Sequence, residues 1–198
     1  CIPALLNAEV LGPCGTDDSQ KPAIAASAVA APVGTAQVQR LLLPGEKAPN
    51  FELTALVRDK VKRIKLSDYD GIWKVLFFYA KDGSPTCKRG CLNFKEQYEL
   101  FQSLTPPVEI IGISEDSIED HRRFKEELGL PFPLLSDPER EVSDAYGVPL
   151  FLGRFPGKSS FLIDPDRKIH YCYDWLFRPR RHVAKILDTL SRLSSGGK

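Results

Sequence analysis

LFFYAKDGSPTCKRGCLNFKEQYELF, residues 76–101, runs from apolar residues through a polar turn into a helical pattern that carries two cysteines. Residues 73–79 are mostly apolar and aromatic and have the length of a strand. Residues 81–85 have the composition of a turn. Ser84 is a favourable N-cap, and Pro85 suits the first helical position because its missing N–H needs no partner there. The stretch therefore predicts a buried strand, a loop and a helix.

Cys87 is the third helical residue when the count begins at the Ser84 cap. Unpaired backbone N–H groups and the positive end of the helix dipole favour an anion at this position. Lys88 and Arg89 add positive charge, so a thiolate is favoured and Cys87 is a candidate nucleophile. The alternative is a small buried hydrophobic residue, which is a common role for free cysteine.

Cys91 shares a helical stripe with Cys87. The apolar residues of this stripe recur at intervals of three and four: Cys87, Cys91, Phe94, Tyr98 and Phe101. Both sulfur atoms should therefore face the core of a long helix. Any buried helix shows such a stripe, so the stripe alone does not assign a role to Cys91.

The segment AKDGSPTCKRGC, residues 80–91, resembles the peroxidatic segment of peroxiredoxins, in which a proline, three residues, a threonine, two residues and a cysteine follow one another. It is most similar to the peroxiredoxin Q type, also called bacterioferritin comigratory protein. The resemblance implies that Cys87 is the peroxidatic cysteine and that Ser84 supplies the hydroxyl of the motif threonine. Ala80 stands where the family has the proline.

The resemblance also implies a resolving cysteine and a cation. Cys91 is the resolving candidate, although the helical pair of the family usually has four residues between its cysteines and this chain has residues 88–90. Cys172 is the alternative. The family arginine before the strand FLID is replaced by Lys158, which keeps the charge but lacks the planar guanidinium. Arg154 is the alternative to Lys158.

The function implied is that of a thiol-dependent peroxidase. It reduces hydrogen peroxide and small organic hydroperoxides through a cysteine sulfenic acid and an intramolecular disulfide, and a thioredoxin-like dithiol donor recycles it. No metal or organic cofactor is required. A redox-sensing or binding module with little peroxidase activity is the alternative, indicated by Ala80 and Lys158. A disulfide oxidoreductase is disfavoured because such enzymes use Cys-x-x-Cys.

Strand and helix patterns alternate around this segment. In chain order, the sequence predicts a strand pair at 51–54 and 63–66, a strand at 108–114, a helix capped by Ser117, an extended piece at 131–135, a helix begun by 136–138, a hairpin of strands 160–164 and 168–173, and a helix at 181–193. This order predicts an α/β, thioredoxin-like fold with a central mixed sheet flanked by helices.

Two details of these elements are also predicted. In the strand 168–173, alternation places Ile169, Tyr171 and Tyr173 on one face and His170 and Cys172 on the other. His121 lies among charged residues, which favours a solvated helix position over a catalytic base.

Length and composition indicate one soluble globular domain with extensions. The chain has 198 residues, 42% of them apolar and 27% charged. We expect a flexible, Ala/Pro-rich N-terminal extension over 1–40, a peroxiredoxin-like domain over 41–193 and a flexible tail over 194–198. The net charge of +1 gives no general attraction to nucleic acid or anionic membranes, and we expect a monomer or weak dimer.

The five cysteines show no disulfide framework, which favours a reducing intracellular compartment. A metal site is disfavoured because the histidines are scattered: His121, His170 and His182. The chain does not begin with methionine, and residues 21–40 lack acidic residues, as the tail of an organelle-targeting peptide would. The acidic residues Glu9, Asp17 and Asp18 argue against a simple transit peptide. A plastid is therefore one expectation and the cytoplasm the other.

Overall fold

The computed structural model describes residues 40–151, 155–174 and 181–195. Its strands are β1 (Glu52–Val57), β2 (Lys60–Lys65), β3 (Trp73–Phe78), β4 (Val108–Ser114), β5 (Leu134–Ser136), β6 (Leu150–Phe151), β7 (Phe155–Pro156), β8 (Ser159–Ile163) and β9 (Ile169–Asp174). Its helices are α1 (Pro85–Glu96), α2 (Tyr98–Ser103), α3 (Ile118–Leu128), α4 (Glu141–Ala145) and α5 (Arg181–Ser195), with a 3-10 turn, η1 (Leu66–Tyr69). The expected extension at 1–40 and tail at 194–198 lie largely outside the described residues.

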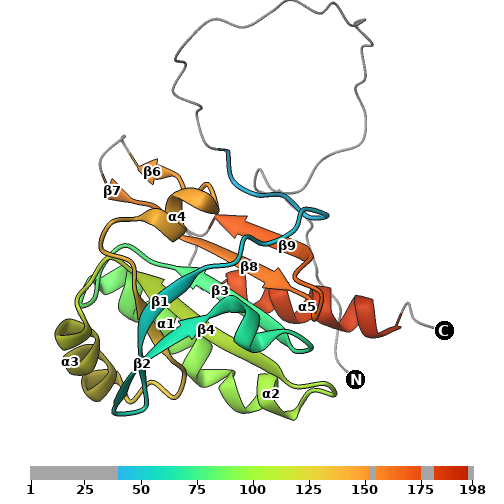
Figure 1. The fold of residues 1–198 in the computed structure, drawn as a ribbon. Helices are drawn as coiled ribbons and strands as arrows, with labels where there is room; N and C mark the ends of the chain where they lie inside the picture. The colour runs from blue at the N-terminus through green and yellow to red at the C-terminus, as the bar shows by residue number, and fades with distance from the viewer. Residues whose placement is uncertain (1–39, 152–154, 175–180, 196–198) are drawn as a thin grey trace, which may run out of the picture.

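The main sheet has seven strands in the order β2-β1-β5-β4-β3-β8-β9. Strand β4 runs parallel to β3 and β5, whereas β1 is antiparallel to β2 and β5, and β8 is antiparallel to β3 and β9. The predicted central mixed sheet flanked by helices is therefore confirmed (Figure 1). Strand β3 lies inside the sheet, between β4 and β8. The loop that leads from it into α1 therefore starts from a strand that is hydrogen-bonded on both sides.

Two hydrophobic clusters cover the two faces of the sheet. Successive residues of β3 alternate between them: Val75 and Phe77 pack with α1 and α5, whereas Leu76 and Phe78 pack with α4 and the segment 41–48. Cys87 and Cys91 belong to the first cluster, and Cys172 belongs to the second. The sheet therefore separates Cys172 from the other two cysteines.

Gly112 of β4 allows Phe77 to lie flat beneath α1. A Cβ atom at Gly112 would be 2.7 Å from Leu134 Cδ2 and 2.7 Å from Phe77 Cζ. The ring of Phe77 in turn stacks on Phe94 of α1, with centroids 4.6 Å apart. A close approach of this kind requires a residue without a side chain.

We expect Gly112→Ala to lower the free energy of unfolding by about 1–3 kcal/mol, the usual effect of overpacking a core. Phe77 and Leu134 are fully buried and cannot swing away. Chemical denaturation of the variant would measure the change. The loss should shrink when Leu134→Ala is added, and an equal loss in both backgrounds would show that a Leu134 clash is not its cause.

Two predicted elements differ in the structure. The long helix is interrupted at Gln97, whose backbone angles of φ −103° and ψ 5° separate α1 from α2. The helix expected at 136–138 begins only at Glu141, after a turn. Its N-cap residue is Arg140, and the carboxylate of Asp137 accepts hydrogen bonds from the backbone N–H groups of Val142 and Ser143 in its first turn, at 3.2 and 2.9 Å.

The face assignment predicted for Ile169 is wrong. A register shift between Leu162 and Ile163 of β8 changes the pairing with β9. Ile169 therefore packs in the same cluster as Cys172, whereas Tyr171 and Tyr173 contact the other cluster. A β-bulge breaks the two-residue alternation on which the prediction depended.

Candidate active site

Cys87 lies in the first turn of α1, as predicted. Ser84 is the N-cap, Pro85 is the first helical residue and Cys87 is the third. The cysteine is fully buried. The Ser84 hydroxyl makes no capping hydrogen bond to the helix backbone; its oxygen lies 3.4 Å from Thr86 Oγ1 instead. The Ser84 side chain is thus directed toward the first turn of α1.

Lys158 reaches the same turn from the other side. It directly precedes β8, whose first residue, Ser159, pairs with Phe78 at the end of β3. The lysine is only 5% exposed, and its Nζ donates a hydrogen bond to Thr86 Oγ1. Three of the predicted site residues, Ser84, Cys87 and Lys158, therefore meet at the start of α1, and Arg154 lies outside the described residues.

Thr86 is the residue that the sequence reasoning missed. It links Ser84 to Lys158 through its hydroxyl oxygen. A signal was present, because the segment SPTC carries two hydroxyl residues before the cysteine. The family pattern points to Ser84 alone. The hydroxyl that accepts the hydrogen bond from Lys158 belongs instead to Thr86, the residue before Cys87.

Of the two cations next to Cys87 in the sequence, one is paired and the other is exposed. The ammonium group of Lys88 forms an ion pair with Glu127 of α3, and the Arg89 residue is exposed. The positive end of the α1 dipole lies beside Cys87, as predicted from its position in the first turn.

Cys91 is fully buried one turn further along α1. Burial raises the pKa of its thiol well above the ordinary value, and Cys87 and Asp82 raise it further. The helix between the two cysteines is intact, and both thiols are free. Cβ atoms four residues apart in a helix are about 5–6 Å from each other, whereas a disulfide requires roughly 3.5–4.5 Å. The first turn must therefore unwind before the two can bond.

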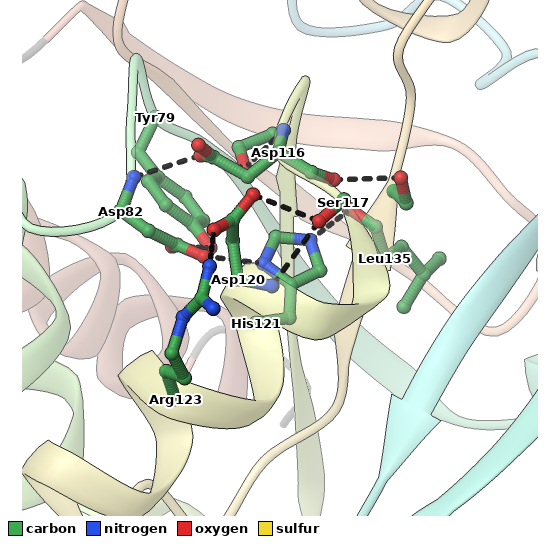
Figure 2. A network of polar contacts seen from close by, with 10 residues as sticks. Tyr79, Asp82, Asp116, Ser117, Asp120, His121, Arg123 and Leu135 are labelled. Atoms are coloured by element: carbon green, nitrogen blue, oxygen red, sulfur yellow. Dashed lines mark hydrogen bonds and ion pairs between the residues drawn. The ribbon is translucent and has the colours of Figure 1, made fainter.

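His121 is buried, and its predicted solvated position is wrong. The side chain is fully covered, and its Nδ1 lies 2.7 Å from Asp82 Oδ2 in the loop before α1 (Figure 2). The charged residues next to His121 in the sequence, Asp120 and Arg122, project from other sides of α3. Because Asp82 is 39 residues away, local sequence did not reveal the pair.

The described ranges contain no group of three or more His, Cys, Asp and Glu side chains that could hold a metal ion. Within these same ranges, no helix is both long and apolar enough to cross a membrane.

Comparison with known proteins decides the family. The family model described as AhpC/TSA matches residues 44–172. The chain belongs to the AhpC/TSA family. The relative named peroxiredoxin Bcp, from Bacillus subtilis, is 39% identical over 158 residues, which cover 76% of this chain and 96% of that protein. The relative named peroxiredoxin Q, chloroplastic, from Oryza sativa subsp. japonica is 36% identical over 75% of this chain and 67% of its own length.

Solved structures of this family have the same fold. AhpC of Mycobacterium tuberculosis superposes with a TM-score of 0.69 and 29% identity, covering 79% of this chain and 96% of that one. The peroxidoxin BcpB of the same organism superposes with a TM-score of 0.67 and 28% identity, covering 75% of this chain and 96% of that one. The thioredoxin-like fold and the peroxiredoxin resemblance are confirmed, and the chain is a thiol-dependent peroxidase of the oxidoreductase class.

Proposed function

We propose that Cys87 is the nucleophile of this peroxiredoxin and that Ser84, Thr86 and Lys158 position and polarise the peroxide. The observation that carries the proposal is the hydrogen bond from buried Lys158 to Thr86, the residue next to Cys87 in the first turn of α1. The Cys87 thiolate attacks one peroxide oxygen, the O–O bond breaks, and Cys87 becomes a sulfenic acid. The other oxygen leaves with a proton, as water from hydrogen peroxide or as an alcohol from an organic hydroperoxide.

Cys91 resolves the sulfenic acid in the second step. Its sulfur attacks the sulfur of Cys87, the S–O bond breaks, and the hydroxyl leaves as water with the thiol proton. Because burial raises the pKa of Cys91, the thiol stays protonated and unreactive while α1 is intact. Unwinding of the first turn both exposes the thiol and closes the distance.

An external dithiol of the thioredoxin type reduces the Cys87–Cys91 disulfide and is itself oxidised to a disulfide. Both cysteines are buried in the intact helix, so the donor acts on the unwound form. We place the cycle in a reducing compartment, either a plastid, as for the chloroplastic relative, or the cytoplasm. No cofactor is needed, and the catalytic unit is a monomer or weak dimer.

The test is peptide mapping after one equivalent of hydrogen peroxide is added to the reduced protein. A Cys87–Cys91 linkage is expected, together with turnover when a thioredoxin and its reductase are supplied. Modification of another cysteine with Cys87 left reduced would overturn the assignment.

A second candidate function is a redox sensor that is oxidised once and turned over slowly. Lys158 in place of arginine and the complete burial of Cys87 favour it, since both restrict attack on peroxide. Rapid oxidation followed by negligible reduction by dithiol donors would support the sensor.

We expect Lys158→Ala to slow the oxidation of Cys87 by about 10- to 100-fold, the scale of a hydrogen bond from a charged group. Lys158→Arg should preserve or raise the rate, because a guanidinium group supplies the charge in a planar fork. Stopped-flow fluorescence under single-turnover conditions measures this step.

Lys158→Met is the matched control, because it keeps the length of the buried stem and removes only the charge. It should be as slow as Lys158→Ala. If all four proteins react with peroxide at one rate, Lys158 has no part in the attack.

A further inference from the structure

The loop at 80–84 leads into α1, and Asp82 anchors it. The Asp82 side chain is 8% exposed. Its Oδ1 accepts a hydrogen bond from the Tyr79 hydroxyl at 2.8 Å, and its backbone N–H donates to Asp116 Oδ2 at 2.7 Å (Figure 2). With His121 at Oδ2, the loop is tied to the end of β3, to the β4–α3 connection and to α3.

Both ring nitrogens of His121 face acceptors. Nε2 lies 3.2 Å from the backbone oxygen of Leu135, and Nδ1 lies 2.7 Å from Asp82 Oδ2. A ring nitrogen that carries a hydrogen donates it to an acceptor of this kind. The Nδ1 contact with the Asp82 carboxylate is the shorter of the two, so it is the main link between α3 and the loop before α1.

The pair lies in a buried setting. The ionisable groups beside it include Tyr79, Cys91 and Asp116. Burial raises the pKa of Tyr79 well above its ordinary value, so its hydroxyl stays a donor to Asp82. Without the ring of His121, Asp82 Oδ2 would lose this partner in a buried position, and the loop would lose its tie to α3.

We propose that Asp82 and His121 form a clamp on the loop before α1, which sets how readily the first turn unwinds to bring Cys91 to oxidised Cys87. The inference rests on the proposed function, because it concerns the resolving step of that cycle. His121 is a positioning residue here, because it acts through Asp82 on the loop that carries the Ser84 cap.

Two isosteric variants separate the two contacts of the ring. In His121→Asn the side-chain amide takes the place of Nδ1 and still donates to Asp82, whereas in His121→Gln it takes the place of Nε2 and the Asp82 contact is lost. We expect His121→Gln to form the disulfide about tenfold faster than the parent, equivalent to about 1.4 kcal/mol. His121→Asn should remain close to the parent. Rapid mixing with peroxide, followed by acid quenching and mass spectrometry, measures the conversion of sulfenic acid to disulfide.

His170 provides a matched control on the far side of the molecule. Its Nε2 lies 2.8 Å from Asp164 Oδ2 at the β8–β9 turn. His170→Asn removes a similar ion-pairing contact and should leave disulfide formation unchanged. If His121→Gln does not fold, Tyr79→Phe removes the other side-chain donor to Asp82 and should also accelerate disulfide formation, by a smaller factor.

The outcomes separate the two proposals. If the parent forms the Cys87–Cys91 disulfide but His121→Gln and His121→Asn form it at equal rates, the clamp alone is wrong. If the parent reacts with peroxide and forms no such disulfide, the proposed cycle is wrong and the clamp falls with it.

Discussion

Cys87→Ser should abolish peroxide reduction and leave the fold intact. A serine hydroxyl cannot form a sulfenic acid, and the loss of a catalytic nucleophile reduces turnover by roughly a thousandfold or more. Serine is close to cysteine in size, so the first turn of α1 should keep its shape. Peroxide consumption with a thioredoxin system measures the loss, and circular dichroism measures the fold.

Cys172→Ser is the control for this substitution. Cys172 is also fully buried, but it packs on the opposite face of the sheet, and it is disulfide-bonded in the structure, unlike Cys87. Its replacement should leave peroxide consumption close to that of the parent. Substantial turnover by Cys87→Ser, or its loss in Cys172→Ser, would move the chemistry to another thiol.

The parts of the fold that sequence could predict are those fixed by local chemistry. The apolar run before Lys81 forms β3, and Ser84 with Pro85 begins α1, because caps and apolar runs act within a few residues. The hydroxyl of Ser117 accepts a hydrogen bond from the backbone N–H of Asp120, as a predicted N-cap should. Such signals survive in any tertiary context.

The wrong predictions concern residues whose placement depends on contacts with residues that are distant in the sequence. His121 was expected in solvent because its neighbours are charged, yet Asp82 and the Leu135 carbonyl bury it. Ile169 was placed on the wrong face because the irregularity at Leu162 in the partner strand shifts the pairing. Neither partner is adjacent in the sequence, so no local pattern could have corrected these predictions.

The candidate site shows the same division. The position of Cys87 followed from counting along a helix, and Lys158 was placed through the family resemblance. Thr86 was missed because its contact is with Lys158, which lies just before β8 and 72 residues later in the chain. The resemblance pointed to Lys158, and only the structure shows that the lysine donates to the hydroxyl of Thr86.

Cys91→Ser should separate the two chemical steps. The oxidation of Cys87 should proceed at nearly the parent rate, because Cys91 lies one turn away from the reacting peroxide. Resolution should slow by about a hundredfold, since a linked thiol acts at an effective concentration near the millimolar range and a dilute external thiol does not. The sulfenic acid should therefore persist, and excess peroxide should convert it to sulfinic acid.

Intact-mass spectrometry over time gives both rates in one experiment. In the parent, oxidation should end in a loss of two hydrogens, as expected for a disulfide. In Cys91→Ser it should end in the addition of one oxygen and then of two. If dithiol donors recycle Cys91→Ser as fast as the parent, resolution does not use Cys91. Because the sheet separates Cys172 from Cys87, a one-cysteine cycle, in which the donor attacks the sulfenic acid directly, would then replace the intramolecular mechanism.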